Sequence, residues 1–240
     1  MTKSTIMYEM DLSAYAGLFT YESLSETTCA VTGCTQDSPI CLVIPDRAPD
    51  GRSVVTIADR AFANHTSLRT VSLPDTLLSI GRRAFAFCTG LVDIRVGKQS
   101  RLSVIGDRAF MGCERLTVLR FGALTSLSSI GRHAFAYCTR LTGVALPAGL
   151  EELAPSLFEG CTALSRVFLP ASLRIIRTGA FAACSSLCSL QLPASVALIE
   201  DCAFAFCAHL SDLRLPASPC VVAASAFREC LSLEELLQVS

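Results

Sequence analysis

The sequence of 240 residues contains no tryptophan, few charged residues and no long hydrophobic run. Any aromatic part of a core or binding site must therefore come from phenylalanine and tyrosine. The longest unbroken apolar stretch is the seven residues from Cys202 to Ala208. A membrane-spanning helix needs about twenty apolar residues, so no transmembrane segment is expected. Hydrophobic residues nevertheless make up 51% of the chain, which supports a core and excludes wholesale disorder.

The motifs of the common enzyme classes are also missing. The chain has no phosphate-binding loop, dinucleotide fingerprint, kinase signature, HExxH helix or nucleophile elbow. The adjacent carboxylates Glu151 and Glu152 would point to opposite faces of a strand, so they cannot act as an acid/base pair. We therefore expect a protein that is not an enzyme, with no catalytic residues and no cofactor.

The N-terminal stretch lacks the features of a secretory leader. Met1 to Leu24 carries four charged side chains and has no apolar central region. This predicts no signal peptide in the chain and, taken alone, a cytoplasmic location. Residues 1–27 have weak periodicity, and we interpret them as an N-terminal segment that is either a short helix or flexible.

Charge is unevenly distributed along the chain, although the net charge is only −1. Residues 51–147 carry thirteen positive and five negative side chains, a net charge of +8. Residues 1–50 have a net charge of −5, and residues 148–240 have a net charge of −4. Lysine is scarce, since eighteen of the twenty cations are arginine. The middle of the chain is therefore basic and both ends are acidic.

The dominant feature of the sequence is a repeat centred on phenylalanine. Eight of these residues recur at intervals of 23 or 25: Phe62, Phe85, Phe110, Phe135, Phe158, Phe181, Phe204 and Phe227. Leucine stands six residues after each of them, and cysteine stands three residues after all but the first, where His65 takes its place. A period of this length is typical of a solenoid, because one coil cannot bury its apolar side alone and stacked coils can.

Each repeat divides into a strand and a turn. In the unit from Leu164 to Pro170, Val167 and Leu169 share one face of a short strand, and Pro170 ends it because it has no N–H to donate. The following Ala-Phe-x-x-Cys segment is too short for an independent helix and predicts a single helical or 3₁₀ turn.

Two nine-residue stretches, Ile80–Cys88 and Ile130–Cys138, read Ile-Gly-Arg-Arg-Ala-Phe-Ala-Phe-Cys and Ile-Gly-Arg-His-Ala-Phe-Ala-Tyr-Cys. They resemble the unit of the BspA-like class of leucine-rich repeat proteins, and the resemblance covers about residues 40–240. It implies a repeat solenoid, a leucine-rich-repeat array of about eight 23–25-residue coils with short parallel strands, at residues 51–240. We interpret residues 28–50 as a degenerate N-terminal capping half-repeat. The resemblance also implies a bacterial surface or secreted protein that attaches to host or cell-surface components.

The thirteen cysteines fall mostly into the repeat. Stacked coils would point the sulfurs of the cysteine column the same way, which disfavours disulfides between them. We expect each to be a small buried hydrophobe whose weak S–H meets a turn carbonyl. Outside the column, zinc at Cys29, Cys34 and Cys41 would need a further ligand, and the spacing lacks a CxxC pair, so no metal is predicted.

The outward positions of the predicted strands suggest a binding surface. The parity that turns Val167 and Leu169 inward turns Arg166 and Phe168 outward, and outward rows of repeat proteins commonly bind partners. The candidate site is an apolar patch with an arginine border: Arg95, Val118, Arg120, Gly143, Ala145, Arg166 and Phe168. An exposed phenylalanine flanked by arginine is the composition of an interaction hot spot. The competing interpretation is that Phe168 is covered by a loop or is one isolated exposed side chain.

A second outward row ends in Ile175, Leu198 and Val221. These residues either line a hydrophobic groove, contact another copy of the chain, or lie half-buried in a second short sheet. The leading hypothesis for function is a module that binds a protein partner, which the sequence does not identify. The alternatives are a small hydrophobic ligand in a surface groove and an anionic polymer on the basic segment 51–147. A two-fold homodimer that pairs basic and acidic halves is a further option, and nucleic acid is not an expected partner.

Overall fold

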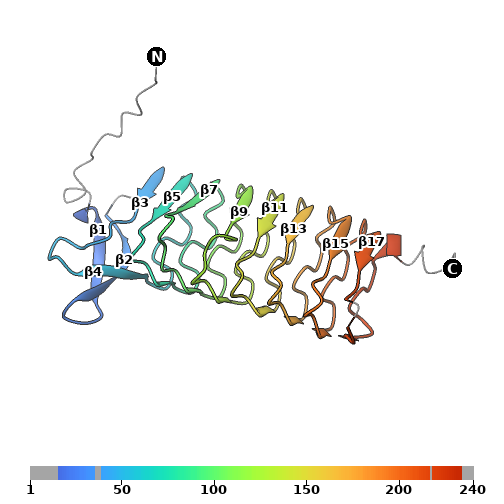
Figure 1. Cartoon of the computed structure of the whole chain (residues 1–240). Helices are drawn as coiled ribbons and strands as arrows, with labels where there is room; N and C mark the ends of the chain where they lie inside the picture. Colours follow the sequence, from blue (N-terminus) through green and yellow to red (C-terminus); the bar gives the residue numbers. More distant parts are fainter. Residues whose placement is uncertain (1–15, 36–38, 217, 234–240) are drawn as a thin grey trace, which may run out of the picture.

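The structure is a computed structural model that describes residues 16–35, 39–216 and 218–233. Figure 1 shows an elongated solenoid whose coils follow one another in sequence order from one end to the other. Each coil has three sides: a longer strand, a tight turn segment and a two-residue strand. The predicted repeat solenoid of about eight coils with short parallel strands is confirmed.

The longer strands of successive coils form one side of the solenoid, here called the front face. They are β3 (Cys41–Val43), β5 (Thr70–Leu73), β7 (Asp93–Val96), β9 (Val118–Arg120), β11 (Gly143–Ala145), β13 (Arg166–Phe168), β15 (Ser189–Gln191) and β17 (Asp212–Arg214). Neighbours pair in parallel and in register. Hydrogen bonding stops between β7 and β9 and again between β13 and β15, so the front face consists of three short sheets.

The short strands form a second side. They are β4 (Ser53–Ile57), β6 (Ser79–Ile80), β8 (Val104–Ile105), β10 (Ser129–Ile130), β12 (Glu152–Leu153), β14 (Ile175–Ile176), β16 (Leu198–Ile199) and β18 (Val221–Val222). This side is interrupted once, between β10 and β12. The inward residue of each pair is the isoleucine, leucine or valine five residues before the column phenylalanine, and all but Val222 are buried.

The N-terminal end is closed by a hairpin that the sequence analysis did not predict. Strand β1 (Phe19–Ser23) pairs antiparallel with β2 (Thr28–Cys34), and β2 pairs in parallel with β4. The expected short helix or flexible segment up to residue 27 is therefore wrong for Phe19–Ser23, whereas residues 1–15 lie outside the described residues. The hairpin forms because Phe19 packs edge-on against Phe62, the first ring of the column, with centroids 6.2 Å apart. It thereby covers apolar surface that an end coil would otherwise expose.

The Ala-Phe-x-x-Cys segments form the third side, here called the turn side. They are single tight turns, as predicted, held by bonds between residues three apart, such as Cys88 N–H to the carbonyl oxygen of Phe85 at 3.2 Å. Alternate N–H groups bond outside the coil: Phe85 N–H donates to the carbonyl oxygen of Ala109 in the next coil at 2.8 Å. Residues on either side adopt the left-handed conformation, as at Arg83 (φ 56°) and Phe87 (φ 59°). In the part of the chain that the structure describes, no helix combines the length and apolarity needed to cross a bilayer.

The bond from the column phenylalanine to the next coil recurs without interruption. It joins Phe62 to Ala84, Phe85 to Ala109, Phe110 to Ala134, Phe135 to Leu157, Phe158 to Ala180, Phe181 to Ala203 and Phe204 to Ala226, at 2.8–3.1 Å. The turn side is thus continuous through all eight coils, whereas the two strand sides are each broken.

The core is a stack of phenylalanine rings behind the turn side. Consecutive rings from Phe62 to Phe227 lie with centroids 5.2–6.0 Å apart and planes within 17° of parallel. The first seven rings are fully buried. Inward leucines and isoleucines of the other two sides complete one continuous hydrophobic cluster.

The cysteine column has the predicted role. Each sulfhydryl donates to the carbonyl oxygen of the phenylalanine one coil earlier, for example Cys88 to Phe62 at 3.1 Å and Cys161 to Phe135 at 3.2 Å. The same bond occurs at Cys113, Cys138, Cys184, Cys207 and Cys230. Burial raises the pKa of the Cys88, Cys161 and Cys207 thiols to about 12.

Candidate functional site

The predicted patch lies on the central sheet of the front face, made of β9, β11 and β13. Parallel pairing places Val118, Gly143 and Arg166 in one row across the sheet. A second row, two residues further along each strand, contains Arg120, Ala145 and Phe168. The structure therefore brings together six of the seven candidate residues, and Arg95 lies on β7, beyond the first break in the front face.

Phe168 provides most of the exposed apolar surface of this patch. It is 68% exposed, whereas Val118 and Ala145 are half-buried and Gly143 is buried. The covering loop considered in the sequence analysis is thus absent from the described residues. An aromatic ring this exposed on a rigid sheet can lose a large apolar area to a partner.

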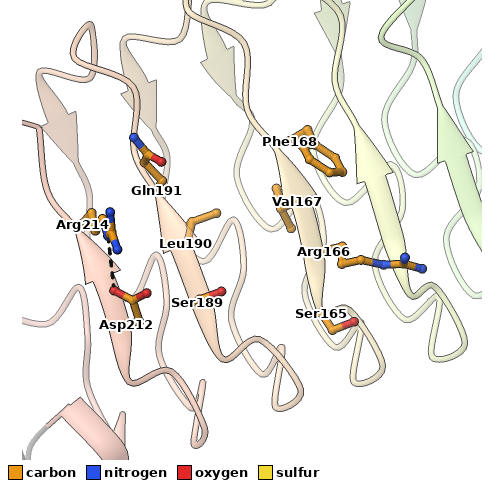
Figure 2. A pocket seen from close by; sticks show the side chains of 9 residues that line it. All are labelled: Ser165, Arg166, Val167, Phe168, Ser189, Leu190, Gln191, Asp212 and Arg214. Atoms are coloured by element: carbon orange, nitrogen blue, oxygen red, sulfur yellow. Dashed lines mark ion pairs between the residues drawn. The ribbon is translucent and has the colours of Figure 1, made fainter.

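A hollow of about 370 Å³ opens beside Phe168, between β13 and β15. Its lining includes Phe168 and Gln191, whereas the Arg166 side chain extends away from β15 and lies over Gly143 of β11 (Figure 2). On its far side Arg214 Nε lies 3.6 Å from Asp212 Oδ1. The hollow coincides with the second break in the front face, where β13 and β15 are not hydrogen-bonded to each other.

A second hollow of about 500 Å³ lies on the other side of the central sheet, between β7 and β9. It is lined by Arg95, Arg120 and Phe121 among others, and it coincides with the first break. This break falls where the two 25-residue coils meet. The arginine border is not uniform, since Arg95 pairs with Asp93 at 3.0 Å, whereas Arg120 and Arg166 form no ion pair within the described residues.

Sequence reasoning identified the rows but missed both hollows. The alternation of inward and outward residues is a property of one strand and is readable from the sequence. Whether neighbouring strands reach hydrogen-bonding distance depends on how whole coils pack, and no local pattern encodes it. By the repeat spacing, the two outward rows would continue at Glu235 and Leu237, which lie outside the described residues.

The row of Ile175, Leu198 and Val221 lies on the second side, in β14, β16 and β18. Ile175 and Leu198 are half-buried members of the short sheet, which was one of the three interpretations. Val221 is 68% exposed, because its coil has no neighbour on the C-terminal side within the described residues. A role of this row in ligand binding or self-association stays a prediction.

The remaining cysteine and glutamate residues considered in the sequence analysis make contacts within the fold. Cys34 Sγ lies 3.8 Å from His65 Nε2, and Cys29 is buried with its sulfur near the backbone oxygen of Ser53. Glu152 binds Arg177 at 2.7 Å and forms no carboxylate pair with Glu151. Within residues 16–35, 39–216 and 218–233, no three cysteine, histidine or acidic side chains gather as a metal site would require.

Comparison with known proteins agrees with this architecture. The sequence profile described as "BspA type Leucine rich repeat region" matches residues 49–125 and 103–234. No curated protein matches the chain significantly.

Among solved structures, a leucine-rich cell surface protein from Faecalibacterium prausnitzii is similar, with 32% identity and a TM-score of 0.73. The match covers 82% of this chain and 52% of the other, so this chain spans about half of that protein's length. The leucine-rich repeat protein of T. pallidum has 29% identity and a TM-score of 0.64, with 92% and 91% of the two chains covered. A third from Eubacterium ventriosum, with 21% identity and a TM-score of 0.64 over 79% of this chain and 58% of its own, shares the fold.

Proposed function

The chain belongs to the BspA-type leucine-rich repeat family, and from this premise we propose that it is a non-enzymatic module that binds a protein partner on its front face. The observation that carries the proposal is Phe168, an exposed ring on the central sheet, with Arg166 on the same strand and Arg120 in the same row two strands away. Interaction hot spots are enriched in aromatic residues and arginine. Exposed aromatic surface on a front row of a solenoid is what a partner would cover.

The two hollows support this proposal because they flank the central sheet. A partner side chain placed beside Phe168 would enter the hollow between β13 and β15, where Gln191 offers a hydrogen-bond donor, and Arg166 lies on the other side of β13, over Gly143. A hollow, an exposed apolar ring and hydrogen-bonding groups thus lie together, which favours one specific binding site on the front face.

We also propose that the partner is a component of a host or of a cell surface. Support comes from the similarity to the cell surface protein of Faecalibacterium prausnitzii, which covers 82% of this chain. A test is the protease accessibility of the protein on intact cells of its own organism. Complete protection in intact cells, with cleavage after lysis, would contradict surface display.

The binding proposal is tested with a photo-crosslinking amino acid at Gln191, which lines the hollow beside Phe168. The crosslinked protein is identified, purified and titrated against wild type and Phe168→Ser. Loss of a central hot-spot ring costs at least about 2 kcal/mol, so affinity should fall by roughly thirtyfold. Phe206→Ser is the matched control, because Phe206 is 53% exposed but lies on the turn side. Equal effects of the two substitutions would contradict a front-face site.

A further inference from the structure

The turn side carries a row of basic side chains in four consecutive coils: three arginines and a histidine, His133, whose pKa burial lowers. Arg60, Arg83, Arg108 and His133 each stand two residues before the column phenylalanine of their coil. Their N–H groups donate to the next coil at 2.9–3.0 Å, so each side chain is one coil from the next. Arg82 and Arg132 precede Arg83 and His133 and are exposed beside the row. This cation row lies on the turn side, which is hydrogen-bonded from coil to coil without a break in the part of the chain that the structure describes.

The backbone at this row is strained. Arg60, Arg83 and Arg108 have φ of 59°, 56° and 56°, in the left-handed region that costs a non-glycine residue about 1–2 kcal/mol. Glycine occupies the equivalent place at Gly179 (φ 66°), so the coil accepts the unstrained residue. Ser156 and Cys202, at the same position in coils outside the row, have φ of 55° and 54°, so this conformation belongs to the coil and does not by itself mark a site.

The charge of the row is not neutralised within the protein. Among the described residues, none of Arg60, Arg82, Arg83, Arg108 and Arg132 forms an ion pair. The two nearby acids each commit an oxygen to the backbone, Asp59 to Arg82 N–H at 2.7 Å and Asp107 to Arg132 N–H at 2.9 Å.

Arg83 is the centre of this uncompensated charge. Its Nε is buried and has no hydrogen-bond partner in the described structure. Burial, together with the charges of Arg82, Arg108 and Arg60, lowers the pKa of its guanidinium. Buried donors are normally satisfied, so this Nε is an exception, and an anion bound to the accessible part of the guanidinium would offset the surrounding positive charge.

A row of aromatic rings runs beside the cations. Phe87 and Tyr137, two residues after their column phenylalanines, are 45% and 47% exposed and also left-handed. Each ring lies over a glycine of the next coil: a Cβ at Gly112 would be 2.7 Å from Phe87, and one at Gly160 would be 2.6 Å from Tyr137. The rings are therefore held against the surface and spaced two coils apart.

Contacts of one side chain show that the two rows are adjacent. Glu159 accepts a hydrogen bond from the Tyr137 hydroxyl at 2.8 Å, and its other oxygen lies 3.5 Å from His133 Nδ1. In the coil after Phe87, the equivalent of Glu159 is Met111, whose carbonyl accepts from Phe87 N–H at 2.7 Å. The position that Glu159 occupies beside Tyr137 is therefore apolar beside Phe87, where the nearby acids are Asp59 and Asp107.

We propose that the turn side between residues 58 and 138 binds an acidic polysaccharide that lies along the array. Carboxylates of the sugars would bind the arginines, which form paired hydrogen bonds with carboxylate. The apolar C–H faces of the sugar rings would pack on Phe87 and Tyr137. A nucleic acid is the competing polyanion, which would bind through its phosphates and stacked bases, and the titration below distinguishes the two. This site is separate from the front-face patch and does not depend on it.

The test is a titration of the protein with a fluorescein-labelled oligomannuronate, which carries one carboxylate on every sugar, at low and high salt. The expected result is binding that weakens with salt and is absent for the carboxyl-reduced oligomer of the same length. Arg83→Gln/Arg108→Gln should weaken binding roughly tenfold. Arg95→Gln/Arg120→Gln removes the same charge from the same two coils on the front face, and it should leave binding within about twofold.

The sugar contact is tested separately with Phe87→Ser, which should weaken the oligomannuronate but leave any binding of oligoglutamate unchanged. Thermal unfolding verifies that each variant folds, and the oligomer should raise the Tm of wild type but not of Arg83→Gln/Arg108→Gln. The proposal is overturned if the oligomannuronate does not bind, if both arginine pairs have the same effect, or if oligothymidylate binds as tightly and Phe87→Ser changes nothing.

Discussion

The rings of Phe110 and Phe135 stack with their centroids 5.3 Å apart and their planes only 2° from parallel. Each belongs to a different coil, so the spacing of the rings is the spacing of the coils. Each buried ring touches the rings on both sides, and removing one opens a cavity that neighbouring coils cannot fill without shifting.

Phe135→Ala should therefore lower the free energy of unfolding by about 3–5 kcal/mol. Phe227→Ala should cost less, because Phe227 stacks on Phe204 alone and is only partly buried. Chemical denaturation of the two variants measures both values. Equal small losses at the two positions would contradict a continuous ring stack.

The buried cysteines predict slow thiol chemistry in the folded protein. Cys113, Cys138 and Cys184 are fully buried, and desolvation holds the pKa of each thiol well above its usual range. The thiolate is the reactive form, so these side chains should react with an aromatic disulfide reagent only on unfolding. The exposed Cys188 should react at once and serves as the internal reference. Rapid modification of all thirteen thiols without denaturant would contradict the burial.

The same thiols predict instability at alkaline pH. The pKa of Cys88, Cys161 and Cys207 rises from about 9 to about 12 on folding, because burial disfavours the thiolate. Their contribution is fully present below pH 9 and is lost as the pH rises toward 12, since the unfolded chain then releases protons that the folded chain retains. Each such thiol should reduce stability by about 1.4 kcal/mol per pH unit in that window.

The measurement is denaturant unfolding at several pH values above 9, under reducing conditions. Cys161→Ala should make the fall of the unfolding free energy with pH less steep by about 1.4 kcal/mol per pH unit, the contribution of one thiol. This expectation does not depend on how the substitution changes stability at neutral pH. A stability that stays constant from pH 9 to 12 would show that the column thiols ionise equally in both states.

The contact between Phe87 and Gly112 predicts a stability effect that depends on both residues. Gly112→Ala adds a left-handed alanine and also pushes a Cβ into the ring, whereas Gly51→Ala adds a left-handed alanine in open space. Gly51→Ala should cost about 1 kcal/mol, and Gly112→Ala should cost more. In a Phe87→Ala background the cost of Gly112→Ala should fall to that of Gly51→Ala. A cost that does not change in that background would mean that the ring does not press on the glycine.

Much of the fold is readable from the sequence, because a repeat converts weak local signals into columns. The phenylalanine stack and the cysteine bonds follow from identical residues at identical places in stacked coils. The left-handed turn residues do not, since Arg83 and Phe87 are types that disfavour that conformation and only the bonds between coils enforce it. The hairpin strand Phe19–Ser23 was missed because it occurs once and has no repeat to support it.

The candidate site was predictable in part for the same reason. Strand parity alone places Arg166 and Phe168 on the outer surface. The turn-side rings were missed, although the sequence carries their signal: an aromatic residue stands two positions after the column phenylalanine at Phe87, Tyr137 and Phe206. The breaks in the strand sides arise from packing between whole coils, which no single stretch of sequence determines.

The continuous turn side gives the molecule an uneven mechanical character. The seven bonds from Phe62–Ala84 to Phe204–Ala226 tie every coil to the next, while the front face is parted twice and the side of short strands once. When the solenoid bends, we expect the hydrogen-bonded turn side to keep its length. The strand sides should change length at their breaks, where neighbouring strands are not hydrogen-bonded. Flexing therefore widens or narrows the hollows beside Phe168 and Arg95, whereas the spacing of the cation row hardly changes. The front face can therefore adapt its shape to a partner, whereas the distance between side chains of successive coils on the turn side stays constant.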